Sequence, residues 1–128
     1  QLGKLNYIIK ENTIRYKAFE KTIPSSVEIR QIPDGSQPIN DTFIFFNETK
    51  KEKERRIKIL QDEGFGTKNL PDAMEWHCTS FWDHALNNSQ ILRSQKTKNI
   101  LDTAIAVPIW LKKEPDEYRS LGEKIFSQ

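Results

Sequence analysis

The chain has 128 residues and 36% of them are hydrophobic, which is enough for one buried core and excludes a disordered or collagen-like chain. The 20 Lys and Arg residues and 18 Asp and Glu residues leave a formal net charge of +2, which does not indicate a nucleic-acid partner. The single cysteine, Cys78, excludes an internal disulfide and favours a reducing compartment. We therefore expect a single domain, residues 1–128, in the cytoplasm.

The sequence predicts no membrane association. No segment reaches the roughly 18 apolar residues that span a bilayer, and the longest apolar stretches, residues 43–46 and 104–111, have the length of strands. The chain opens at Gln1 directly with a helical pattern, without Met and without a signal peptide. We expect such a chain to be a fragment of a longer protein.

The first predicted element is an amphipathic helix over residues 2–21. Apolar residues such as Leu2, Leu5 and Tyr16 recur at helical spacing, with polar residues between them. Pro24 marks the end of this element, because proline lacks the N–H group that a continuing helix needs.

Strands are predicted within residues 26–47. The alternation in "SVEIRQI", residues 26–32, predicts a strand with one solvated face. The following "PDG" predicts a turn, because proline presets its own φ and glycine adopts a positive φ without strain. "TFIFF", residues 42–46, is continuously apolar and predicts a central strand buried on both faces.

A second helix is predicted over residues 49–63, with Thr49 as its N-terminal cap and Gly64 at its C-terminal end. Its lysines and arginines form the only basic cluster of the chain. Glu52 lies four positions before Arg56, however, which favours a solvated, ion-paired helix over a nucleic-acid surface.

The rest of the chain predicts a loop region, residues 64–96, followed by a helix, a strand and a helix within residues 97–128. A short helix is expected from near Thr97, and "AIAVPIW", residues 104–110, predicts an edge strand or a strand end because it contains proline. Pro115 is favourable in the first turn of the last helix. This element order indicates an α+β fold, with a small mixed or antiparallel sheet covered by helices.

The most unusual stretch is "GFGTKNLPDAMEWHC", residues 64–78. Within it, "TKNLP" places Lys68, Asn69 and backbone donors directly after a glycine. This combination is typical of the surroundings of an anionic or polyhydroxylated ligand, so the stretch is a candidate for one side of a binding cleft.

The residues His77, Cys78, Asp83 and His84 raise the question of a metal or catalytic centre. Their side-chain types bind zinc, but adjacent His and Cys residues rarely face one ion, and no second cluster completes four ligands. A Cys–His nucleophile would need a third, orienting group. We expect neither, and the pattern alone favours a packing role for the aromatic segment 76–82, with the histidines as hydrogen-bonded neighbours.

Four segments of the chain resemble, in this order, parts of the proteins of one family. They are "QLGKLNYIIKENTIRYKAFEK", "DTFIFF" with the helix after it, "FGTKNLPDAMEWH" and "AIAVPIWLKKEPDEYRSLGEKI". They are similar to the linking helix and carboxy-terminal domain of the DegT/DnrJ/EryC1 family of pyridoxal-phosphate (PLP)-dependent sugar aminotransferases. The resemblance covers essentially the whole chain. It implies the α+β fold of the carboxy-terminal domain of fold-type I PLP aminotransferases.

By this resemblance, His77 matches a histidine near the bound nucleotide-sugar, and Lys68 and Asn69 lie on the loop that approaches the sugar. The family continues this histidine as His-x-x-Pro-Tyr, whereas this chain has "HCTSFWDH", so the contacts after His77 do not transfer. The resemblance thus implies Lys68, Asn69 and His77 as substrate-binding residues, and a substrate that is a nucleotide-sugar or keto-sugar.

The family's Schiff-base lysine motif, of Ser-Phe-His-x-x-Lys type, is absent from the sequence. The resemblance therefore implies a small domain that lacks catalytic and cofactor-binding residues. PLP would be held by a separate amino-terminal domain of the parent, which would be a homodimer. A sugar dehydratase, in which histidine replaces that lysine, would have the same small domain.

Two other classes of function stay open at this stage. One is a standalone protein-interaction or ligand-binding module that uses the aromatic segment 76–82 as its contact surface. The other is a small nuclease with His77 and His84 as acid and base.

Overall fold

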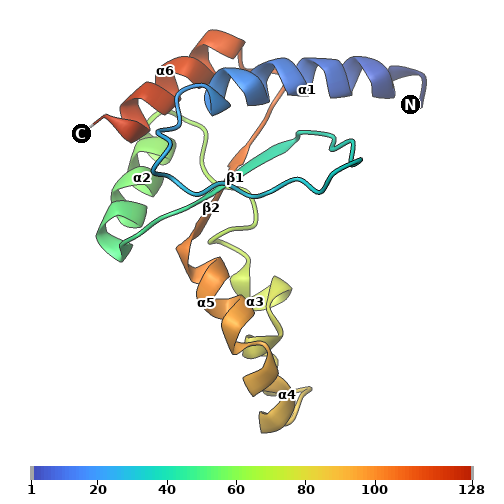
Figure 1. Cartoon of the computed structure of the whole chain (residues 1–128), viewed down its shortest axis with the longest axis vertical. Helices are drawn as coiled ribbons and strands as arrows, with labels where there is room; N and C mark the ends of the chain where they lie inside the picture. The colour runs from blue at the N-terminus through green and yellow to red at the C-terminus, as the bar shows by residue number, and fades with distance from the viewer. Residues whose placement is uncertain (1, 128) are drawn as a thin grey trace.

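Residues 2–127 are described by the computed structural model, which shows a two-stranded antiparallel sheet between groups of helices (Figure 1). Strand β1 (Thr42–Phe46) pairs with strand β2 (Ala104–Pro108), and Ile44 lies opposite Ala106 at the centre of the register. The predicted α+β class, with a small sheet covered by helices, is confirmed.

The helices occur in the expected order, but the loop region 64–96 contains three short ones. Helices of three to six residues are too short to show a helical period in the sequence, which is why that pattern predicts loops. The helix expected from near Thr97 begins two residues earlier, at Gln95. The helical elements are η1 (Leu2–Lys4), α1 (Leu5–Glu20), α2 (Lys50–Asp62), α3 (Met74–His77), η2 (Thr79–Phe81), α4 (Asn88–Arg93), α5 (Gln95–Thr103) and α6 (Pro115–Phe126).

The prediction of a strand over residues 26–32 is wrong. This segment makes a single bridge to β1, in which Ile29 lies opposite Phe45. The N–H of Arg30 donates to the carbonyl of Ile44 at 3.0 Å. The alternation correctly placed Val27 and Ile29 toward the core, but Ile32 is exposed, and the turn that starts at Pro33 ends the pairing before a strand forms.

The first face of the sheet carries the larger core. Phe43 and Phe45 of β1 and Ile105 and Val107 of β2 are fully buried on this face. Their aromatic rings pack edge to face or tilted against neighbouring rings, with Phe19 and Phe43 at 5.1 Å between centroids. The helical residues that cover them are Tyr16 and Phe19 of α1, Leu60 of α2, and Tyr118, Leu121 and Ile125 of α6.

The second face carries a smaller cluster. Ala104 and Ala106 are buried there, and Leu70 and Met74 pack over them. Ile44 and Phe46 of β1 share this face, whereas in β2 the two-residue alternation places the small side chains here and the larger ones on the first face. Helices α3, α4 and α5 extend from this region, at the end of the molecule opposite to α1 and α6 (Figure 1).

Helix α2 has the caps that its sequence predicts. The side chain of Thr49 accepts a hydrogen bond from the N–H of Glu52. At the other end, Gly64 has a φ of 72°, and the N–H of Phe65 donates to the carbonyl of Leu60 at 2.9 Å. This left-handed termination turns the chain back and places Phe65 in the core.

Arg56 of α2 is buried and joins three parts of the fold. Its guanidinium pairs with Glu52 at 2.5 Å and donates to Asn47, just after β1, at 2.9 Å. Asn47 in turn donates to the carbonyl of Thr103, just before β2. The predicted ion pair along the helix is therefore present, and the basic residue at its centre is part of the structural framework.

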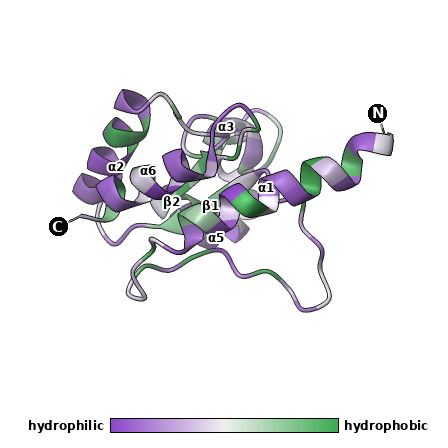
Figure 2. Cartoon of the chain, turned by 90° about the horizontal axis from the view of Figure 1, so that it is seen from above, coloured by the Kyte–Doolittle hydropathy of each residue, from purple (hydrophilic) through white to green (hydrophobic). Residues whose placement is uncertain are grey.

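Only the second half of α1 packs on the sheet. Its buried residues begin at Asn12, whereas Leu2 is 86% exposed and Leu5 is 40% exposed. Figure 2 shows the first half of α1 projecting past the rest of the chain. Within residues 2–127, no helix is both long enough and apolar enough to cross a bilayer.

Helices α1 and α6 approach each other closely where α1 ends. A Cβ atom on Gly122 would lie 1.8 Å from Oγ1 of Thr22, so only glycine allows this contact without a shift of the backbone. The fold depends here on the absence of a side chain.

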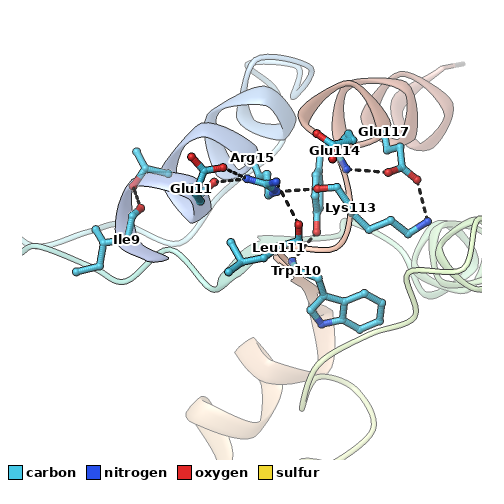
Figure 3. Close-up of polar contacts among 10 residues, drawn as sticks. Ile9, Glu11, Arg15, Trp110, Leu111, Lys113, Glu114 and Glu117 are labelled. Carbon is cyan, nitrogen blue, oxygen red and sulfur yellow. Dashed lines mark hydrogen bonds and ion pairs between the residues drawn. The ribbon is translucent and has the colours of Figure 1, made fainter. Parts of the chain in front are cut away.

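Arg15 connects α1 to the loop between β2 and α6 (Figure 3). Its Nε donates to the carbonyl of Lys113 at 2.7 Å, and one terminal nitrogen donates to the carbonyl of Leu111 at 3.2 Å. The other terminal nitrogen pairs with Glu11 at 2.8 Å. Since Arg15 is only 5% exposed, these carbonyls have little access to water as an alternative donor.

We expect Arg15→Met to lower the free energy of unfolding by about 2–4 kcal/mol, because methionine keeps the apolar packing but leaves two carbonyls without donors. Urea denaturation followed by circular dichroism measures this change. The matched control is Arg119→Met, which removes an exposed pair with Asp116 and should cost less than about 0.5 kcal/mol. Equal effects of the two variants would contradict the role of Arg15.

Candidate functional site

The three residues predicted to contact a ligand, Lys68, Asn69 and His77, line one cavity of about 350 Å³. The cavity lies on the second face of the sheet, since Ile44 of β1 and Ala106 of β2 form part of its wall. The structure therefore brings together residues that the sequence spreads over ten positions.

Lys68 and Asn69 are held by a turn that brackets the peptide group of Ala106. The N–H of Lys68 donates to the carbonyl of Ala106 at 2.9 Å, and the N–H of Ala106 donates to the carbonyl of Leu70 at 3.1 Å. Asn69 lies at the apex with a φ of 68°, a conformation that asparagine tolerates better than most residues. The turn thus covers the outer edge of β2 and directs Lys68 and Asn69 to the cavity.

Lys68 forms an ion pair with Asp41, the residue that precedes β1. The distance from Nζ to Oδ2 is 2.7 Å, and the side chains are 38% and 54% exposed. The hydrogen bond from Lys68 lowers the pKa of the Asp41 carboxyl below its ordinary value, and partial burial opposes this change. Asp41 is therefore a carboxylate at neutral pH.

His77 is the last residue of α3 and is exposed. The helix is anchored by Met74, which packs on the second face of the sheet. The N–H of Cys78 donates to the carbonyl of Met74 at 2.9 Å, which closes the helical turn. His77 therefore reaches the cavity from a short but anchored helix.

Two further residues of the cavity, Arg30 and Asp41, are absent from the sequence prediction. A local signal exists for each of them. Arg30 lies on the polar side of the alternation in "SVEIRQI", and Asp41 directly precedes the apolar run of β1. Neither signal says which other segments lie nearby, so neither residue could be assigned to this cavity from the sequence.

A second, aromatic groove of about 600 Å³ lies beside α3 and η2. The indole N–H of Trp82 donates to the carbonyl of Glu75 at 3.0 Å, which fixes the ring in the groove wall. Trp76 is 81% exposed, so the predicted packing role of the aromatic segment 76–82 does not hold for this residue. Phe81 does pack on the second face of the sheet.

The candidate metal and nucleophile residues do not converge. Cys78 is 1% exposed, and among residues 2–127 no group of three His, Cys, Asp or Glu side chains could hold a metal ion. His77 lines the cavity, whereas His84 lines the aromatic groove. The arrangement therefore gives no support to an acid–base pair formed by His77 and His84.

The groups in the cavity are mainly hydrogen-bond donors with one carboxylate among them. Arg30, Lys68 and Asn69 donate, and Asp41 accepts. This combination suits a ligand that carries hydroxyl groups or negative charge, and it lacks an activated nucleophile.

The comparisons with known proteins support a fold and no more. Neither a protein-family model nor a curated protein matches the sequence. Among solved structures, the chain is similar to Spr1654 from Streptococcus pneumoniae, which is described as a sugar aminotransferase and was solved in its PMP form. The TM-score is 0.65 at 11% sequence identity, and the match covers 98% of this chain.

The chain spans about a third of the length of that structure, since the match covers 33% of it. The α+β fold is therefore the fold of one part of a sugar aminotransferase. At this identity, the shared fold does not assign an activity or a substrate to this chain.

The cavity does not present the groups that hold PLP. Lys68 is the only lysine among its described lining residues, and it is ion-paired with Asp41. These lining residues also include no glycine-rich turn at the start of a long helix, the arrangement that binds phosphate groups.

We expect the Asp41 carboxyl to titrate below its ordinary range and to return toward that range in Lys68→Met. A lowered native pKa means that the pair stabilises the folded chain above the ordinary Asp pKa, and that this contribution is lost as the pH falls through the native value. Carboxyl-carbon NMR titration measures both values. The same Asp41 pKa in the two proteins would contradict the ion pair.

Proposed function

We propose that the chain is the carboxy-terminal small domain of a PLP-dependent nucleotide-sugar aminotransferase of the DegT/DnrJ/EryC1 family. In this proposal the parent is a cytoplasmic homodimer, and its amino-terminal domain holds PLP. The substrate is a nucleotide-linked keto-sugar that receives an amino group from an amino acid. The small domain supplies part of the sugar pocket through Lys68, Asn69 and His77.

One observation carries this proposal. Three residues that the family resemblance implies as substrate-binding line the same cavity, in a chain whose whole length has the fold of one part of a sugar aminotransferase. The resemblance depends on the sequence segments alone, whereas the cavity exists only in the folded chain, so the two lines of support are separate.

The exposed apolar residues fit a domain with a missing neighbour. Leu2 and Leu5 on the projecting half of α1 are exposed (Figure 2), as is Trp76 in the aromatic groove. Large exposed apolar groups of this kind are typical of surfaces that another protein part covers. In the proposal, the PLP domain packs against them.

The roles of the chain's own residues follow from their chemistry. The Lys68 ammonium and the Asn69 amide donate hydrogen bonds to sugar oxygens, and the His77 ring orients a further hydroxyl. Closure of the small domain over the substrate excludes water from the reacting carbon. PLP, when bound in the parent, supplies the electron sink for amino transfer. A sugar dehydratase would use these residues in the same way.

The test joins this chain to the polypeptide encoded upstream of Gln1, where the proposal expects a PLP-binding lysine. We expect the joined protein to bind PLP and to transfer an amino group to a nucleotide-linked keto-sugar. His77→Ala should lower kcat/KM about tenfold, since one hydrogen bond to substrate is lost, with PLP content unchanged.

His84→Ala is the matched control, because His84 lines the aromatic groove instead of the cavity. It should leave kcat/KM within about twofold of the wild-type value. The proposal is wrong if no PLP lysine is encoded upstream, or if both histidine variants behave alike.

The high exposure of Trp76 favours a second candidate, a standalone interaction module that uses the aromatic groove. In this case, the reading frame begins directly before Gln1 and the groove binds a second copy of the chain. A central exposed tryptophan is a frequent energetic anchor in such interfaces.

For the module, we expect the purified chain to self-associate through the groove. Trp76→Ser should raise the dissociation constant of self-association at least about tenfold, and Tyr7→Ser on the projecting half of α1 should not. Sedimentation velocity over a concentration series measures both. A monomeric wild-type chain, or a larger effect of Tyr7→Ser, counts against the module.

A further inference from the structure

Arg30 is a cavity residue with an unused donor. Its Nε is buried and has no hydrogen-bond partner among residues 2–127, although its side chain lines the same cavity as Lys68 and His77. Buried polar groups in folded proteins nearly always have a partner. The unpaired Nε makes Arg30 a candidate donor to a ligand.

The backbone holds Arg30 in a defined position. Its N–H donates to the carbonyl of Ile44 at 3.0 Å, and the preceding residue, Ile29, lies opposite Phe45 of β1. Arg30 thus starts from the outer edge of β1, while Lys68 starts from the outer edge of β2. The two cations enter the cavity from opposite edges of the sheet.

The charges of the described residues leave Arg30 without a counterion. Asp41 pairs with Lys68, and no ion pair of Arg30 exists in the described part of the chain. Burial, aided by Glu20, raises the pKa of the Tyr16 hydroxyl by more than the charge and hydrogen bond of the adjacent Arg30 lower it, so the hydroxyl supplies no negative charge at neutral pH. Among Arg30, Lys68 and Asp41, one positive charge is therefore uncompensated.

The Asp41 carboxylate already shows how an oxyanion is held in this cavity. It receives a hydrogen bond of 2.7 Å from the Lys68 ammonium. A guanidinium offers a planar pair of donors that matches carboxylate and phosphate oxygens still better than an ammonium does. An oxyanion of a ligand could therefore bind Arg30 while Lys68 keeps its internal partner.

We propose that Arg30 is a specificity-determining residue of the cavity, which binds an oxyanion, carboxylate or phosphate, carried by the ligand. This inference rests on the proposed function only in taking the cavity as a ligand site. Through Arg30, the cavity selects acidic ligands over neutral sugars of the same size.

The test titrates the full 128-residue chain with inorganic phosphate and, separately, with acetate, at constant ionic strength. Backbone amide NMR shifts report the binding site. We expect saturable shifts confined to residues around the cavity, including Arg30 and Asn69, with a dissociation constant in the millimolar range. Preference for phosphate or for acetate distinguishes the two sources of oxyanion, and either result supports the proposal.

Three variants make the assignment specific. Arg30→Met should weaken binding at least about tenfold, and Arg30→Lys should fall between Arg30→Met and the wild type, because lysine keeps the charge but not the planar pair of donors. Arg119→Met removes an exposed arginine on α6 and should change binding less than about twofold. Unchanged amide shifts far from the cavity confirm that each variant is folded.

The proposal is overturned if neither anion gives saturable shifts, if chloride gives the same shifts, or if Arg30→Met binds as tightly as the wild type. These outcomes leave the aminotransferase assignment intact, because that assignment is tested by PLP binding and by His77→Ala in the joined protein. Conversely, a failed aminotransferase assay would leave oxyanion binding by the chain itself measurable.

Discussion

A sheet of only two strands must be covered on both faces and along both outer edges, and this constraint organises the chain. Helices α1, α2 and α6 cover the face with the large side chains. The segment around Ile29 bridges the outer edge of β1, and the turn at residues 68–70 brackets Ala106 on the outer edge of β2. The candidate site lies between these two edge covers, so the covers that protect the sheet also position its charged residues.

The two faces of the sheet differ because alternate residues of β2 differ in size. Phe43 and Phe45 point to one face and require bulky helices above them. Ala104 and Ala106 point to the other and leave room above the strands for a cavity. The same alternation thus produces a filled core on one side and a binding surface on the other.

The shared fold at 11% identity and the site carry different kinds of information. A fold at this distance reflects conserved packing geometry and not conserved side-chain chemistry. The functional proposal therefore depends on the cavity itself, where polar side chains converge from four segments of the chain. The exposed half of α1 and the aromatic groove are two further surfaces that another polypeptide can cover.

The sequence by itself determined the features that depend on neighbouring residues: the caps of α2 at Thr49 and Gly64, the apolar strand at residues 42–46, and the polar stretch that contains Lys68 and Asn69. Only the tertiary structure decided that Asp41 meets Lys68, 27 positions away, and that Arg30 lies at the same cavity. It also decided that residues 26–32 form a bridge and no strand. Periodicity and capping report interactions within a few residues, whereas these contacts exist only once the strands pair and their edges are covered.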